Sequence, residues 1–153
     1  DVERSRGLGD VYKRQAQRFE LPVLLHVRHA HAQVIATLKR FKLRRAGIIH
    51  AFAGSYEEAR EYLKLGFKLG LGGAATWPQA KRLRQVLPRL PLDAVVLETD
   101  SPDMAPAMHP HIRNSPVHLP AICRELATLF AVEPEVLATA SSGNAAALFG
   151  WRN

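Results

Sequence analysis

The sequence predicts an α/β fold built around a parallel β-sheet. Four short apolar runs begin near residues 22, 47, 67 and 94, and such runs are typical of buried parallel strands. Segments with helical spacing of apolar residues lie between them, so strand and helix alternate. The strand starts are 20–27 residues apart. This spacing suits both a (β/α)8 barrel and an open doubly wound sheet, and the pattern alone leaves both open.

The first half of the pattern contains two strand–helix units. Residues 22–26 form the first expected strand, and an amphipathic helix follows it. Residues 47–52 form the second expected strand. Ser55 and Glu58 then have the spacing of a capping box, which predicts a helix over residues 56–65.

The second half continues the alternation and ends in helices. Strands are expected at residues 67–71 and 94–97, and Thr76 with Gln79 repeats the capping-box spacing ahead of the helix between them. A long loop with four prolines follows the fourth strand over residues 101–116. The closing helices are expected at residues 119–130, 134–139 and 144–149.

The amino-terminal stretch differs from the rest of the chain. Residues 1–15 show neither helical nor strand periodicity, and we expect them to be foreign sequence or disordered. Residues 16–153 form the predicted domain. The lone cysteine, Cys123, excludes an internal disulfide and indicates a reducing compartment. No signal peptide or apolar run of about 20 residues is present, so we expect a cytoplasmic protein without a membrane partner.

The charge of the chain is positive and unevenly distributed. Lys plus Arg number 21 against 14 Asp plus Glu, and residues 1–92 carry 18 of the basic but only 7 of the acidic side chains. The basic excess is concentrated in residues 39–45 and 81–84. Such clusters either contact the phosphates of a polyanionic substrate or lie as solvated helix ends. Intrinsic disorder is excluded by the 47% content of hydrophobic residues.

Three residues that can bind metal follow predicted strands. His26 ends the first strand, His50 lies near the end of the second, and Asp100 follows the fourth. Neighbouring strands are about 4.8 Å apart, so two histidines on adjacent strands can share one metal ion. Asp100 faces them only if the sheet curls, as it does in a closed barrel.

Four segments at the ends of the predicted strands form a pattern: LPVLLHVR at residues 21–28, IHAFAG at 49–54, LGLGG at 69–73 and LETDSP at 97–102. Together they resemble the TatD family of metal-dependent hydrolases. NAAALFG at residues 144–150 is similar to the closing helix of that family. The resemblance covers residues 16–151.

The resemblance implies the carboxyl-terminal part of a (β/α)8 TIM barrel of the amidohydrolase type. It implies a cytoplasmic deoxyribonuclease with two divalent cations (Mg, Mn or Zn) in the intact enzyme. His26 and His50 would bind one metal. Asp100 would bind the other and act on the attacking water. Arg28 would hold a phosphate of the DNA substrate or form an ordinary salt bridge, Glu98 receives no role, and no stable protein partner is expected.

The family's HxH pair on the first strand and its bridging glutamate have no counterpart in this sequence. His29-Ala-His31 has the HxH spelling but follows a strand end. His109 and His111, in the long loop, are candidates for substrate contact or solvent-exposed side chains. We therefore expect a truncated nuclease that is inactive alone. The alternatives are a non-catalytic remnant that binds nucleic acid or metal, and a hydrolase of a non-nucleic ester or amide.

Overall fold

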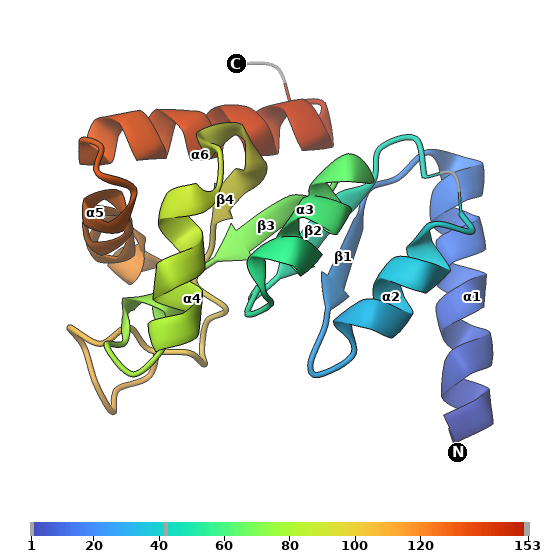
Figure 1. Ribbon diagram of the computed structural model, residues 1–153, viewed down its shortest axis with the longest axis horizontal. Helices are drawn as coiled ribbons and strands as arrows, with labels where there is room; N and C mark the ends of the chain where they lie inside the picture. Colours follow the sequence, from blue (N-terminus) through green and yellow to red (C-terminus); the bar gives the residue numbers. More distant parts are fainter. Residues whose placement is uncertain (1, 42, 152–153) are drawn as a thin grey trace.

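The computed structural model describes residues 2–41 and 43–151, and the side chains of residues 11–41 and 43–151. A four-stranded parallel sheet lies at its centre (Figure 1). The strands are β1 (Val23–His26), β2 (Gly47–His50), β3 (Lys68–Leu71) and β4 (Val95–Leu97). Their spatial order is β1-β2-β3-β4, the order of the chain. A doubly wound sheet reverses its strand order at a switch point, whereas a (β/α)8 barrel keeps the chain order. The topology is therefore that of part of a barrel.

One face of the sheet is covered by helices that follow the strands. These are α2 (His31–Leu38), α3 (Tyr56–Lys64) and α4 (Lys81–Val86), which lie one after another in Figure 1. The main core lies between them and the sheet, and its fully buried side chains include Ile49, Leu69 and Tyr62. Helix α5 (Leu119–Phe130) adds Ile122 and Leu126 to the same core.

Helix α6 (Pro134–Phe149) lies along β4 at the upper edge of Figure 1. The Asn144 side-chain amide donates to the carbonyls of Leu92 and Val95, at 2.8 and 2.7 Å. Leu148 packs in a small cluster with Ile48 and Val96. These contacts hold the helix near the amino ends of the strands, so the opposite, carboxyl ends stay free for a site.

Most predicted elements are present, with three differences. Helix α1 (Val2–Phe19) occupies the stretch expected to lack regular structure, so that expectation was wrong; the origin of residues 1–15 stays a prediction. The Ser55–Glu58 capping box is present, with both reciprocal hydrogen bonds. Thr76 does not cap α4: it ends a 3₁₀ helix (Gly73–Thr76), and its hydroxyl donates to the carbonyl of Gly73. Helix α6 runs unbroken where the sequence predicted two helices.

Besides the 3₁₀ helix at Gly73–Thr76, three further 3₁₀ helices connect the strands and α-helices. They lie at Leu87–Arg89, Leu92–Ala94 and Pro116–His118. Cys123 is buried on α5, as expected for a small apolar side chain, and burial raises the pKa of its thiol. Among the described residues, no helix has the length and apolar character needed to cross a bilayer.

Candidate active site

The site lies at the carboxyl ends of the strands, where the two predicted histidines meet. His26 and His50 are direct register partners at the ends of β1 and β2. Their ring centroids are 5.5 Å apart and their planes are tilted by 42°. Both fall on the same side of the sheet because the paired positions of parallel strands point the same way. The predicted juxtaposition of these two rings is present in the structure.

The His50 ring lies between two carboxylates that follow β4. Its Nδ1 atom is 2.9 Å from Oε1 of Glu98, and its Nε2 atom is 3.5 Å from Oδ1 of Asp100. Strands β2 and β4 are separated by β3, so these contacts cross two strand spacings, about 9.6 Å in a flat sheet. The sheet therefore curves enough to bring Asp100 towards the histidines, as the sequence required.

Glu98 is the residue whose part in the site the sequence reasoning missed. The sequence analysis gives Glu98 no role, but its carboxylate and that of Asp100 both contact the His50 ring. Its Oε1 also accepts the Ala51 backbone N–H at 2.7 Å. Glu98 crosses β3 at Gly70, where a Cβ atom would lie 2.3 Å from its Oε2. A glycine in a strand interior often marks such a close approach, and this was the available signal.

The segment after Asp100 is held by one buried side chain. Asn114 is 3% exposed, and its amide donates to the carbonyls of Thr99 and Asp103, each at 2.7 Å. The Asn114 backbone N–H donates to the carbonyl of Pro102 at 2.9 Å. Asp100 itself has a left-handed backbone with φ of 57° and a side chain that is 40% exposed. Asn114 thus fixes the turn that presents this carboxylate.

The donor atoms fit one part of a metal centre. Nδ1 of His50 lies against the Glu98 carboxylate, and the neutral tautomer with its hydrogen on Nδ1 would direct the lone pair of Nε2 towards the Asp100 carboxylate. The 3.5 Å between Nε2 of His50 and Oδ1 of Asp100 would allow one divalent cation to contact both atoms, since metal–ligand distances are about 2.0–2.2 Å, whereas the resemblance assigns these two residues to different cations. A carboxylate on the other ring nitrogen is the usual partner of a metal-binding histidine. Within residues 11–41 and 43–151, no three His, Cys, Asp or Glu side chains form a complete cation site.

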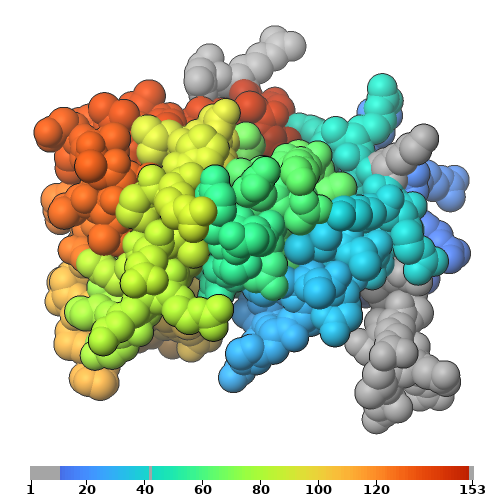
Figure 2. All heavy atoms as spheres, viewed as in Figure 1, coloured from blue at the N-terminus to red at the C-terminus, as the bar shows by residue number. Residues whose placement is uncertain are grey.

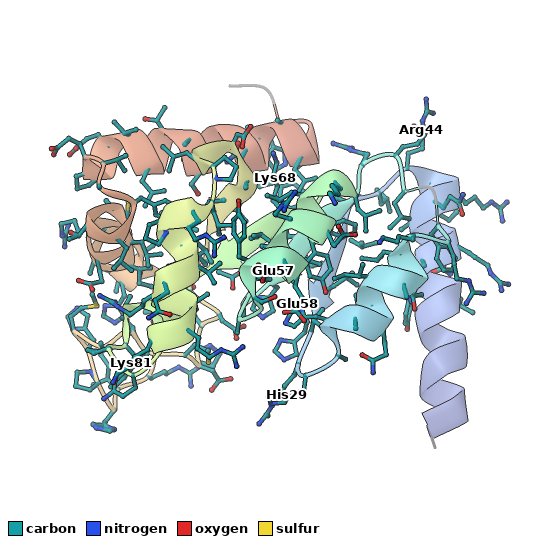
Figure 3. All side chains as sticks on the ribbon, in the orientation of Figure 1. His29, Arg44, Glu57, Glu58, Lys68 and Lys81 are labelled. Carbon is teal, nitrogen blue, oxygen red and sulfur yellow. The ribbon has the colours of Figure 1, made fainter. Side chains whose placement is uncertain are left out.

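A groove with a volume of about 890 Å³ begins beside His26. It passes between the β1–α2 segment, the first turn of α3 and helix α4, and Figure 2 shows the surface notched there, at the lower edge between blue and yellow-green residues. Figure 3 shows His29 at the same lower edge, with Glu57 and Glu58 above it. Ala51 and Met104 line both this groove and the small pocket at Glu98 and Asp100. The groove is therefore continuous with the site.

Arg28 lines the groove and is exposed. Among the side chains that the structure describes, none forms an ion pair or hydrogen bond with its guanidinium. The ordinary salt bridge considered for Arg28 is thus absent from this part of the chain. Its planar donor fork remains available to a phosphate.

The remaining histidines have other surroundings. The Nδ1 atom of His31 lies 3.0 Å from the hydroxyl of Tyr62, in the core beside the groove. The rings of His109 and His118 are in contact, with centroids 4.3 Å apart and planes tilted by 33°. His111 is exposed. Neither His109 nor His111 lines the groove.

The two basic clusters also differ from one another. In the first, Lys39 pairs with Glu61 at 2.6 Å and Arg45 donates to the carbonyl of Leu148 at 2.6 Å. Arg44 pairs with Glu20. Lys42 lies outside the described residues. Three side chains of the first cluster therefore make internal contacts, while the second cluster lies on α4, beside the groove.

Comparison with known proteins identifies the family. The family described as TatD related DNase matches residues 11–150. The chain belongs to the TatD family. The resemblance seen in the sequence is confirmed, and the match includes residues 11–15 of the stretch expected to be foreign.

Individual relatives agree with this assignment. An "Uncharacterized metal-dependent hydrolase" of Haemophilus influenzae is 40% identical over 134 residues, which cover 88% of this chain and 51% of that protein. The "3'-5' ssDNA/RNA exonuclease TatD" of Pantoea vagans is 38% identical, with 88% and 54% covered. The crystal structure of the TatD homolog YjjV from Escherichia coli superposes with a TM-score of 0.92 at 36% identity, covering 97% of this chain and 57% of that one.

These coverages show that the chain spans about half the length of the curated relatives it matches. The predicted fold class, part of a (β/α)8 barrel of the metal-dependent hydrolase type, is confirmed by the strand order and by the superposition on YjjV.

Proposed function

We propose that this chain forms part of a metal-dependent phosphodiesterase that hydrolyses single-stranded DNA. The single observation that carries the proposal is the position of His50, whose ring lies between Glu98 and Asp100 and beside His26. A TatD relative named as an exonuclease of single-stranded DNA and RNA supports the choice of substrate.

In this proposal His26, His50 and Asp100 hold divalent cations. The intact enzyme has two such cations, which are Mg, Mn or Zn. When bound, such cations lower the pKa of a water molecule and offset charge on phosphoryl oxygens. Asp100 is the catalytic residue, because its half-exposed carboxylate can orient the attacking water and accept its proton. Glu98 is the positioning residue of His50, because its carboxylate, 2.9 Å from Nδ1, would accept a hydrogen there and keep Nε2 free to bind.

Arg28 is the proposed substrate-binding residue of the same site. It follows His26 by two residues and points its unpaired guanidinium into the groove that begins there. A guanidinium binds two phosphate oxygens at once, so Arg28 can fix the DNA backbone relative to the ligands.

The test compares Asp100→Asn with Asp103→Asn. Both change one carboxylate to an amide on the same loop, but only Asp100 faces His50. The assay follows loss of nucleotides from end-labelled single-stranded DNA with Mg²⁺, Mn²⁺ or Zn²⁺ and with EDTA, using the protein encoded by the longest reading frame that contains this chain. We expect cleavage that needs metal, survives Asp103→Asn and falls by at least about a hundredfold in Asp100→Asn.

Co²⁺ binding, followed by its visible absorption, adds a readout that does not depend on turnover. Asp100→Asn should weaken Co²⁺ binding about 10–100-fold, whereas Asp103→Asn should leave it unchanged. Full cleavage by Asp100→Asn would refute the assignment. Cleavage of carboxylic esters or amides with no cleavage of DNA would favour the alternative hydrolase, and metal or DNA binding without any turnover would favour the non-catalytic alternative.

A further inference from the structure

The far part of the groove is formed by helix α4 and the turn after it. Arg82, Gln85, Val86 and Arg89 line the groove there and face Tyr56 in the first turn of α3. Buried Leu87 and Leu90 anchor the turn to the core. This wall is therefore fixed in position, although the arginines on it are exposed.

The three arginines of this region have different surroundings. Arg84 is held internally: its guanidinium donates to the carbonyl of Ala75 at 3.1 Å and pairs with Glu125 at 3.0 Å. Arg82 precedes it by two positions, about 200° around the helix, and so points to the groove. Among the described side chains, Arg82 has no ion pair or hydrogen bond partner. The charge of Arg84 is thus neutralised within the fold, while that of Arg82 is open to a ligand.

Arg89 lies over an aromatic ring. Its guanidinium carbon is 3.6 Å from the centroid of the Tyr56 ring. This contact orders the guanidinium without using its N–H donors, and a carboxylate partner is absent from the part of the chain that the structure describes. One face of the guanidinium covers Tyr56, and the opposite face is turned away from that ring. A planar cation held in this way is a platform on which a nucleobase can stack.

The charge of the groove matches a polyanion. Arg28, Arg82 and Arg89 line it against Glu57 and Glu58. The Glu58 carboxylate is already engaged, because it accepts the Ser55 N–H at 2.7 Å in the capping box. The guanidiniums therefore outnumber the carboxylates that face them.

We propose that Arg82, Arg89 and Tyr56 form a nucleotide-binding subsite for single-stranded nucleic acid. The Tyr56–Arg89 stack holds an unpaired base, and Arg82 pairs with a phosphate of the same strand. The strand then runs along the groove from this subsite to His26. The proposal rests on the proposed function, because it extends the path of the same substrate. Duplex DNA hides its base faces and gains only the phosphate contacts.

The test measures binding without cleavage. A fluorescent oligothymidylate and an abasic strand of equal length are titrated with the full chain in EDTA, and anisotropy gives each dissociation constant. We expect Arg89→Ala and Tyr56→Leu to weaken oligothymidylate binding about tenfold and to change abasic-strand binding much less. Arg82→Ala should weaken both strands equally and reduce the slope of log K against log salt by about 0.7.

Two controls accompany these variants. Arg124→Ala removes an exposed arginine from α5, outside the groove, and should leave binding unchanged. Tyr56→Phe keeps the ring and should bind the oligothymidylate like the parent chain. Circular dichroism melting confirms that each variant is folded.

The proposal is overturned if Arg82→Ala and Arg89→Ala bind both strands as well as Arg124→Ala does. It is also overturned if Arg89→Ala weakens the abasic strand as much as the oligothymidylate, because the stack then holds no base. Since EDTA removes the cations, these results are independent of the metal-dependent cleavage that tests the proposed function. A chain that binds through this subsite but never cleaves would separate the two conclusions.

Discussion

Gly70→Ala tests whether Glu98 reaches His50 through the gap above β3. The added Cβ would lie 2.3 Å from Oε2 and 2.8 Å from Cδ of Glu98. Ordinary contact begins near 3.4 Å, so the carboxylate must move by about 1 Å. Gly70 has no left-handed backbone, and alanine can adopt its conformation without strain. The substitution therefore acts mainly through the displaced carboxylate.

The cost follows from the two contacts of Oε1. A shift of about 1 Å breaks both the 2.9 Å contact to His50 Nδ1 and the 2.7 Å hydrogen bond from Ala51 N–H. Each is worth about 1–1.5 kcal/mol in a half-buried setting. Alanine also stabilises the folded chain by about 0.5–1 kcal/mol, because it lowers the conformational entropy of the unfolded chain relative to glycine. The net loss is about 2 kcal/mol, or roughly 4–8 °C in melting temperature for a chain of this size.

A double-mutant cycle with Glu98→Ala supplies the assay. Calorimetric melting is measured for the parent chain, the two single variants and the pair, together with Co²⁺ affinity. In the Glu98→Ala background, Gly70→Ala should cost less than about 0.5 kcal/mol, because the carboxylate it displaces is gone. Both single variants should bind Co²⁺ about 10–100-fold more weakly. An equal cost of Gly70→Ala in both backgrounds would refute the role assigned to Glu98.

Three further substitutions test the surroundings of the site. Tyr62→Phe should cost about 1–2 kcal/mol at neutral pH, since His31 loses its buried partner. Burial, with a smaller effect of a nearby carboxylate, raises the pKa of Tyr62 from 10 to about 12. The free energy of unfolding should therefore fall between pH 10 and pH 12, because the unfolded chain releases the phenol proton first. Urea titrations should show that Tyr62→Phe reduces this fall. Ser55→Ala should lower the urea-derived stability by about 1 kcal/mol through loss of the cap, and an unchanged midpoint would contradict the capping role. Asn114→Ala should cost about 2 kcal/mol and expose the segment after Asp100 to limited proteolysis, which an intact segment would rule out.

The strands could be predicted because burial on both faces leaves a simple pattern. Ile49 and Leu69 are completely buried, and the runs that contain them end in polar or glycine residues. The choice between barrel and open sheet could not be made from that pattern. It depends on curvature, which appears only when β2 and β4 bring His50 and Asp100 within 3.5 Å.

The errors in the elements have local causes. Thr76 has the spacing of a cap, but its hydroxyl donates to Gly73 and accepts the Ala107 N–H, a partner 31 residues away. Tertiary contacts of this kind leave no trace in local spacing. Helix α1 contains Gly7 and Gly9, each of which disfavours helix by about 1 kcal/mol relative to alanine, so propensity argued against it.

The error at Glu98 has a different cause, because the sequence held the information needed to avoid it. In an extended chain, side chains alternate, so Glu98 shares a side with Val96 rather than with Leu97. Val96 packs with Ile48, two positions before His50, so Glu98 lies on the side from which His50 projects. Gly70 is the register partner of Val96 and lies next to His50, and it leaves the space that Glu98 crosses. A glutamate just past a strand end, beside a strand whose paired position is a glycine, is therefore a reason to look for a contact between its carboxylate and a histidine on the far side of that strand.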